Sequence, residues 1–149
     1  MEFITFYIIL IAGVVATTVM TLFSHLVSKI RKHEFNEAQL LNKFIDATEF
    51  LPDVNKENAI WGWLIHYTMG IIFAAWMYCI FKSFDSEITL WLGGILGLIA
   101  GMIGAVGWMG LFALHSKPPR TDVKEFIIQL LMAHCIFGVI VSFILIMYM

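Results

Sequence analysis

Four long apolar runs limit what this chain of 149 residues can fold into. They cover roughly residues 3–27, 59–81, 88–114 and 126–148. A helix needs about 20 apolar residues to cross a bilayer, and a run of this length satisfies its backbone in lipid only as a helix. The sequence therefore predicts an all-α, polytopic membrane protein, with residues 1–149 forming a single domain around a four-helix transmembrane bundle.

Composition excludes several other classes of protein. Hydrophobic residues make up 60% of the chain and charged residues 13%, against about 45–50% and 25% in soluble domains. The net charge of −2 offers no basic surface for nucleic acid, so we expect the lipid bilayer as the main partner. The chain contains no phosphate loop, dinucleotide motif or nucleophile–base arrangement, which leaves open whether it is an enzyme.

The basic residues indicate an orientation in the membrane. Only Lys82 follows the second run, whereas eight of the nine Lys and Arg residues lie after the first and third runs. Cytoplasmic connections carry an excess of Lys and Arg, so both termini are predicted to lie outside. The eight residues are Lys29, Arg31, Lys32, Lys43, Lys56, Lys117, Arg120 and Lys124.

The first connection has a helical pattern of its own over residues 34–50. Apolar residues recur there at near-helical spacing, and charged residues lie between them. The pattern predicts a short amphipathic helix on the inner membrane surface, ended by Pro52 and Asp53. The apolar positions are Phe35, Ala38, Leu41, Phe44 and Ile45, and the polar ones are Glu37, Asn42, Lys43, Asp46 and Glu49.

The second and fourth runs share the motif His-x-x-x-Gly, as His66 with Gly70 and His134 with Gly138. Both histidines lie at a similar distance from the predicted cytoplasmic end. The match predicts two copies of one helical hairpin in the same orientation, related by an axis along the membrane normal. Such an axis would let His66 and His134 face each other across the bundle.

Histidines inside spans suggest a cofactor site in the cytoplasmic half of the bundle. Two neutral imidazoles on facing helices can ligate the iron of haem b, and Gly70 and Gly138 would leave flat space for its ring. A transition metal is the other cofactor that we consider. Its predicted ligands are His25, His66, His115 and His134.

The same histidines also permit a function without a cofactor. A neutral imidazole is satisfied by one carbonyl or one hydroxyl, and Thr17, Thr21 and Ser24 form a polar stripe on the first run. The alternatives are therefore a non-catalytic membrane module, or a pathway for protons or small solutes, with hydrogen-bonded structural histidines.

The third run carries glycines at every fourth position, at Gly93, Gly97 and Gly101. Small residues at this spacing let another helix approach closely. The spacing predicts close packing, either within the bundle or between protomers of a homo-oligomer.

Two stretches and a short motif carry a resemblance to a known family. They are Glu57-Asn-Ala-Ile-Trp-Gly-Trp-Leu-Ile-His66-Tyr-Thr-Met-Gly70-Ile-Ile-Phe-Ala-Ala, Leu130-Leu-Met-Ala-His134-Cys-Ile-Phe-Gly138, and Ala-Thr-Thr-Val-Met-Thr in the first run. Over most of its length the chain resembles an uncharacterised family of small four-span bacterial membrane proteins. The resemblance implies a four-helix fold in a bacterial inner membrane and carries over His66, Gly70, His134 and Gly138. It implies no activity, and it does not carry over His25 or His115.

Overall fold

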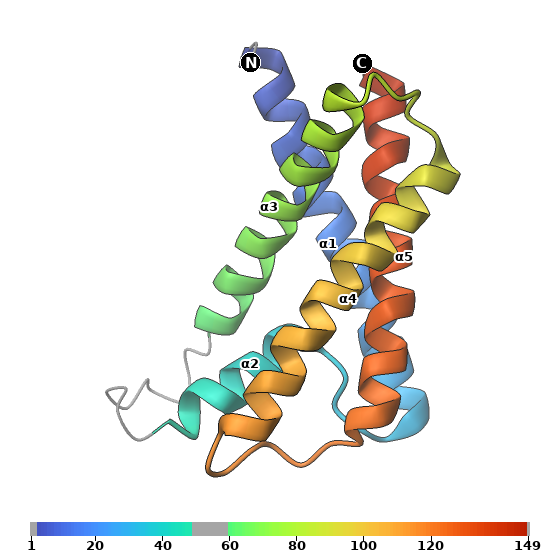
Figure 1. Cartoon of the computed structure of the whole chain (residues 1–149). Coiled ribbons are helices and arrows are strands. Elements are labelled where there is room, and N and C mark those ends of the chain that lie inside the picture. The colour runs from blue at the N-terminus through green and yellow to red at the C-terminus, as the bar shows by residue number, and fades with distance from the viewer. Residues whose placement is uncertain (1–2, 49–59, 149) are drawn as a thin grey trace.

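A computed structural model describes residues 3–48 and 60–148, and its regular structure is helical (Figure 1). Four of its helices are long and apolar enough to cross a membrane, which confirms the predicted fold class. A shorter helix, α2, follows the first of them. The helices are α1 (Phe3–Arg31), α2 (Glu37–Asp46), α3 (Trp61–Ser83), α4 (Leu90–Leu114) and α5 (Val123–Tyr148).

The helix ends differ from the apolar runs by up to four residues, because capping groups fix where several helices begin. α5 starts three residues earlier than predicted, since the Glu125 N–H donates to Asp122 Oδ1 at 2.9 Å. α4 starts two residues later, where the Leu92 N–H donates to Thr89 Oγ1 at 3.2 Å. Hydropathy identifies which part of the chain forms a span, whereas the capping group determines the residue at which its first turn begins.

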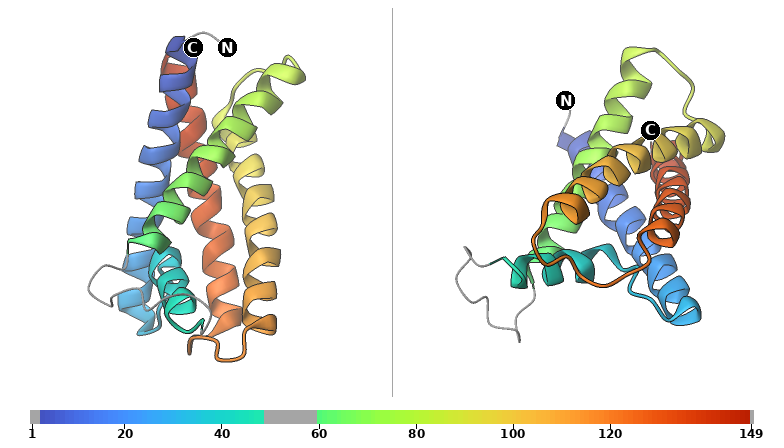
Figure 2. Two further views of the ribbon diagram at one scale, coloured as in Figure 1. Left: turned by 90° about the vertical axis from the view of Figure 1, so that its left-hand side faces the viewer. Right: turned by 60° about the horizontal axis from the view of Figure 1, so that its bottom comes forward.

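The four long helices form an open bundle. α5 packs against both α1 and α4, while α3 packs against α1 and makes few contacts with α4. Figures 1 and 2 show α3 crossing α1 near the middle of α3 and leaning away from α5 at the end where α2 lies. The helices therefore leave space at both ends of α3, one at the end with α2 and one near the termini, where Ile4, Tyr78 and Tyr148 line a cavity of about 480 Å³.

The predicted amphipathic helix exists, but it is shorter than 34–50 and packs into the bundle. Asn36 caps its start, with the Gln39 N–H donating to Asn36 Oδ1 at 3.1 Å. The Gly62 N–H of α3 donates to Asn42 Oδ1 at 2.7 Å, so α2 is bound to α3. Its buried residues are Glu37, Ala38, Leu40, Asn42 and Phe44. Residues 49 and 50 and the predicted stop at Pro52 and Asp53 lie outside the described residues.

The outer surface of the bundle is apolar. Large side chains such as Ile72, Val106 and Phe143 are about half exposed or more. A surface of this kind is unfavourable in water and favourable in lipid. The protein is therefore built to contact a bilayer along its four long helices.

The glycines of α4 bring it against α5 of the same chain. A β-carbon on Gly97 would lie 2.9 Å from the Cα atom of Gly138, and one on Gly101 would lie 2.9 Å from Cβ of His134. Gly93 faces Ser142 on α5 in the same way. Of the two uses that the spacing allowed for these glycines, the structure shows packing within the bundle.

Candidate functional site

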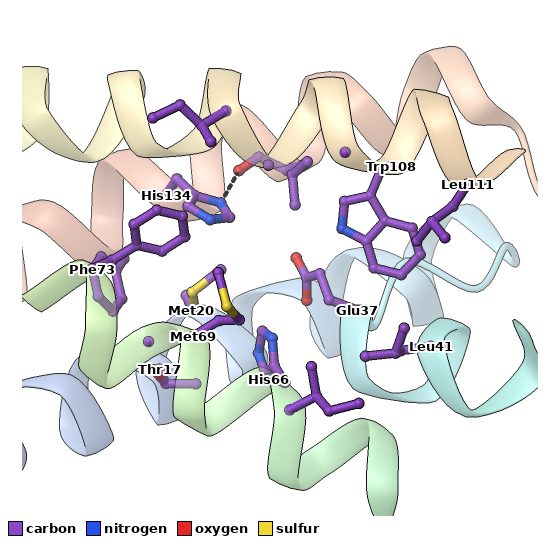
Figure 3. Close-up of a pocket in the computed structure, with 17 residues that line it drawn as sticks. Thr17, Met20, Glu37, Leu41, His66, Met69, Phe73, Trp108, Leu111 and His134 are labelled. Carbon is purple, nitrogen blue, oxygen red and sulfur yellow. Dashed lines mark hydrogen bonds between the residues drawn. The ribbon is translucent and has the colours of Figure 1, made fainter. Parts of the chain in front are cut away.

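A cavity of about 430 Å³ lies between α3 and α4, at the end of the bundle where α2 lies. Side chains from all five helices line it, and most of them are apolar (Figure 3). It exists because α3 and α4 diverge, and α2 lies at its end. The lining residues are Thr17, Met20, Glu37, Leu41, Ile65, His66, Met69, Gly70, Phe73, Ile103, Gly104, Gly107, Trp108, Leu111, Leu130, His134 and Phe137.

His66 lines this cavity from α3 and is tied to α1 by its Nε2 atom, which lies 3.0 Å from Thr21 Oγ1. The Thr21 hydroxyl donates its one hydrogen to the Thr17 carbonyl at 2.7 Å. The Nε2–H group of His66 must therefore be the donor to Thr21. In the neutral ring this leaves Nδ1 unprotonated, and among the described residues it has no hydrogen-bond partner.

His134 lines the cavity from α5 and is buried, with 7% of its surface exposed. Its Nδ1 atom lies 2.9 Å from the Leu130 carbonyl oxygen, one turn back on the same helix. A carbonyl only accepts, so Nδ1 carries the hydrogen and Nε2 is left unprotonated in the neutral ring. Nε2 has no partner within the described part of the chain, and it lies on the side facing Gly104 of α4.

The two histidines thus have the same chemistry at one cavity. Each ring is held in a fixed orientation by one nitrogen and keeps a lone pair on the other. A histidine anchored in this way can accept a hydrogen bond from a ligand or ligate a metal. The sequence correctly grouped His66 and His134 at one place in the bundle, and the structure adds the tautomer of each.

Glu37 is a cavity residue that the sequence prediction missed. It was placed on the polar side of a surface helix, whereas it lies 3% exposed between α2 and the bundle. Ser24 Oγ of α1 lies 3.0 Å from Oε1 as its donor, and Oε2 has no partner among the described residues. Burial raises the pKa of Glu37 to about 7, and its hydrogen bonds oppose that shift only in part.

A signal for Glu37 was present in the helical spacing. Glu37, Leu41 and Phe44 fall at i, i+4 and i+7, which places them on one face of a helix. Phe44 packs edge-to-face on Phe112 of α4, with ring centroids 5.0 Å apart. A carboxylate on the same helix face as core residues is itself a candidate core residue. No other charged residue on that face marks it as a site.

The two predicted glycines serve helix contacts. Gly70 borders the cavity, but a β-carbon there would collide with the Thr17 side chain of α1. At Gly138 a β-carbon would lie 2.7 Å from Gly97 Cα of α4. Neighbouring helices, and not open space for a flat ring, therefore lie against both positions.

The other two predicted metal ligands are not at the cavity. His25 is exposed on α1. His115 follows α4, where Nε2 lies 3.2 Å from Thr48 Oγ1 and Nδ1 accepts from the Lys117 N–H at 3.1 Å. Within residues 3–48 and 60–148, no three His, Cys, Asp or Glu side chains come together as a metal site. The structure brings together the two histidines of the repeated motif and not the set of four.

Comparison with known proteins places the chain in a family. No curated protein and no solved structure matches it. A family model matches residues 6–148, nearly the whole chain, and its description is "Family of unknown function (DUF6789)". An uncharacterised family was expected from the resemblance, and the chain belongs to DUF6789.

Proposed function

We propose that this membrane protein binds a small, largely apolar ligand in the cavity between α3 and α4, with His66 and His134 as polar contacts. One observation carries the proposal: two anchored imidazoles border one cavity, and each has a nitrogen without a partner in the described residues. Polar atoms that border a largely apolar cavity without a protein partner favour a ligand that satisfies them.

The walls define the rest of the ligand. A cavity of about 430 Å³ lies within the range of about 300–1,000 Å³ that holds small molecules. Met20, Met69 and Phe73 offer apolar contact, and methionine adapts to irregular shapes. The ligand is therefore mainly hydrocarbon and carries one polar group that can donate hydrogen bonds.

Haem b is a second candidate, favoured by the two free imidazole nitrogens. Axial ligation needs one lone pair from each histidine, and the observed hydrogen bonds leave one on each. The ring would lie in the cavity between α3 and α4, since helices occupy the space beside Gly70 and Gly138. When bound, haem would supply electron-transfer or oxygen chemistry, and this chain would supply its ligands and an apolar surrounding.

The membrane and orientation complete the proposal. We place the protein in a bacterial inner membrane with α2 on the cytoplasmic side and both termini outside, as the basic residues indicate. We do not propose that protomers associate through Gly93, Gly97 and Gly101, because these glycines contact α5 of the same chain.

Purified protein in detergent tests both candidates. An absorption spectrum detects haem by its Soret band, and mass spectrometry of an organic extract detects an apolar ligand. We expect His66→Ala and His134→Ala each to remove the bound molecule, while His25→Ala, on the exposed surface, keeps it. Folded, colourless wild-type protein without any extracted ligand would leave the histidines as structural residues bonded to Thr21 and Leu130, and would refute the proposal.

A further inference from the structure

We propose that the polar group of this ligand is a cation, a lipophilic ammonium, and that the Glu37 carboxylate is its counter-ion. The inference rests on the proposed function, since it assigns a chemical class to the ligand of the same cavity. It starts from the oxygen atom that the protein leaves unsatisfied. Figure 3 shows the Glu37 carboxyl group directed into the space between His134, His66 and Trp108.

Glu37 has no cationic partner in the described part of the chain. The ion pairs there join Arg31 to Glu125 and Lys43 to Glu34, and the cavity is lined by no Lys or Arg. Ser24 satisfies one carboxylate oxygen. The neighbouring Gln129, whose Nε2 donates to the same Ser24 hydroxyl at 2.6 Å, also favours the carboxylate, but neither side chain carries a positive charge. A buried carboxylate is stable only when it is paired or protonated, so a cationic ligand would complete this site.

The remaining walls suit a cation with an apolar body. Trp108 lines the cavity, and an indole face attracts cations more strongly than other aromatic rings do. The free nitrogens of His66 and His134 are acceptors for ammonium hydrogens. An ammonium has enough N–H donors for both the Glu37 carboxylate and the histidine nitrogens, whereas the hydroxyl of a neutral alcohol donates only one hydrogen.

The same site exchanges a proton for the cation. Near neutral pH a carboxyl group with a pKa of about 7 is close to half protonated. The titratable groups facing it are His66 of α3 and His134 of α5, with Glu34 before α2 adding a repulsion that favours protonation. Binding of an ammonium stabilises the carboxylate, so the carboxylic O–H releases its proton to the solvent as the cation enters.

Adamantan-1-amine and adamantan-1-ol are a matched pair of probes, since they differ in charge and share one apolar body. We expect calorimetry with detergent-purified protein to show amine binding that is about 30-fold weaker at pH 5.5 than at pH 8, the ratio of ionised Glu37. Glu37→Gln keeps an acceptor for Ser24 and should lose at least about tenfold in amine affinity. Glu125→Gln, a carboxylate on the exposed rim of α5, is the control and should bind as the wild type does.

The outcomes separate the inference from the proposed function. If the alcohol binds as well as the amine, or if Glu37→Gln binds the amine normally, the cavity remains a ligand site and the assignment of a cationic ligand is wrong. If neither probe binds folded wild-type protein, both the cation and the proposed function of the cavity are overturned. A proton released per amine bound, measured in buffers of different ionisation enthalpy, would support the exchange.

Discussion

The two hairpins of the bundle, α1 with α3 and α4 with α5, use the same motif but pack to different extents. In each, the glycine of His-x-x-x-Gly lies where the second helix meets the first: Gly70 against Thr17, and Gly138 against Gly97. α4 and α5 have backbone against backbone at that point, and α5 is the most buried of the four spans. At Gly70 α1 and α3 have the Thr17 side chain between them, their close backbone contact lies at Gly13 and Ile71, and α3 is the least buried span.

This difference explains where the cavity lies. α4 approaches α5 at Gly93, Gly97 and Gly101 in succession, so that hairpin is closed over several turns, whereas α1 and α3 meet around Gly13 and Gly70 and α3 then leans away toward α2. α2 partly fills that space, bound to α3 through Asn42 and to α1 through Glu37. The closed hairpin, α4 with α5, therefore forms one wall of the cavity, and the open hairpin, α1 with α3, forms the other together with α2.

The largest effect is expected from filling the closed contact. Gly138→Leu forces a side chain against the Gly97 backbone, which cannot move aside, and should lower the free energy of unfolding by about 3 kcal/mol or more. Unfolding of purified protein in a denaturing detergent measures it. Gly107→Ala on α4, where nothing lies within 4 Å, should change stability by less than about 1 kcal/mol. Equal effects of the two changes would contradict the assigned contact.

Glu37, at the open hairpin, should make the stability of the protein depend on pH. The pKa of Glu37 is about 7 in the folded protein against 4.5 ordinarily, so the folded state binds the proton more tightly. Proton binding by Glu37 therefore adds about 3 kcal/mol to the free energy of unfolding. This contribution is complete below pH 4.5 and is lost as the pH rises through 7. Unfolding measured between pH 5 and 8 should show this decline in the wild type and lose most of it in Glu37→Gln.

A smaller effect should come from filling the contact in the open hairpin. Gly70→Ala collides with Thr17, a side chain that can be shortened, and should cost about 1–3 kcal/mol. Adding Thr17→Ala should recover at least half of this loss in the same unfolding assay. No recovery would mean that the Thr17 side chain is not what a β-carbon at Gly70 collides with.

The smallest effect is expected where the two hairpins are joined at the surface. Arg31 of α1 and Glu125 of α5 form an ion pair in which their side chains are 54% and 32% exposed. Glu125→Gln should reduce stability by less than about 1 kcal/mol, and high salt should remove that difference. A larger loss would show that the hairpins depend on this pair to stay together.

The fold was predictable because lipid imposes a simple rule on apolar runs. All four spans follow from hydropathy. The orientation of α2 was not predictable in the same way. Its polar and apolar residues alternate enough to suggest a surface helix, and only the packing of α1, α3 and α4 shows that both sides are covered.

Only the histidines of the site were predictable from the sequence, for a related reason. His66 and His134 attract attention because histidine is rare in apolar spans. Glu37 does not, because it lies in a charged connection where a carboxylate is ordinary. The tautomers of the histidines depend on Thr21 and Leu130, and no spacing rule in the sequence shows which hydroxyl has already donated its hydrogen.

The hydroxyls of α1 have a consequence for how the protein enters the membrane. Thr17, Thr21 and Ser28 each donate to the backbone carbonyl four residues before, and Ser24 can do the same before α2 packs, since its hydroxyl also lies 3.0 Å from the Met20 carbonyl. A helix without unmet donors can cross into lipid alone, before any partner is available. During synthesis α1 can therefore become the first stable span, and α3 can dock onto hydroxyl oxygens that still have a lone pair for the His66 ring.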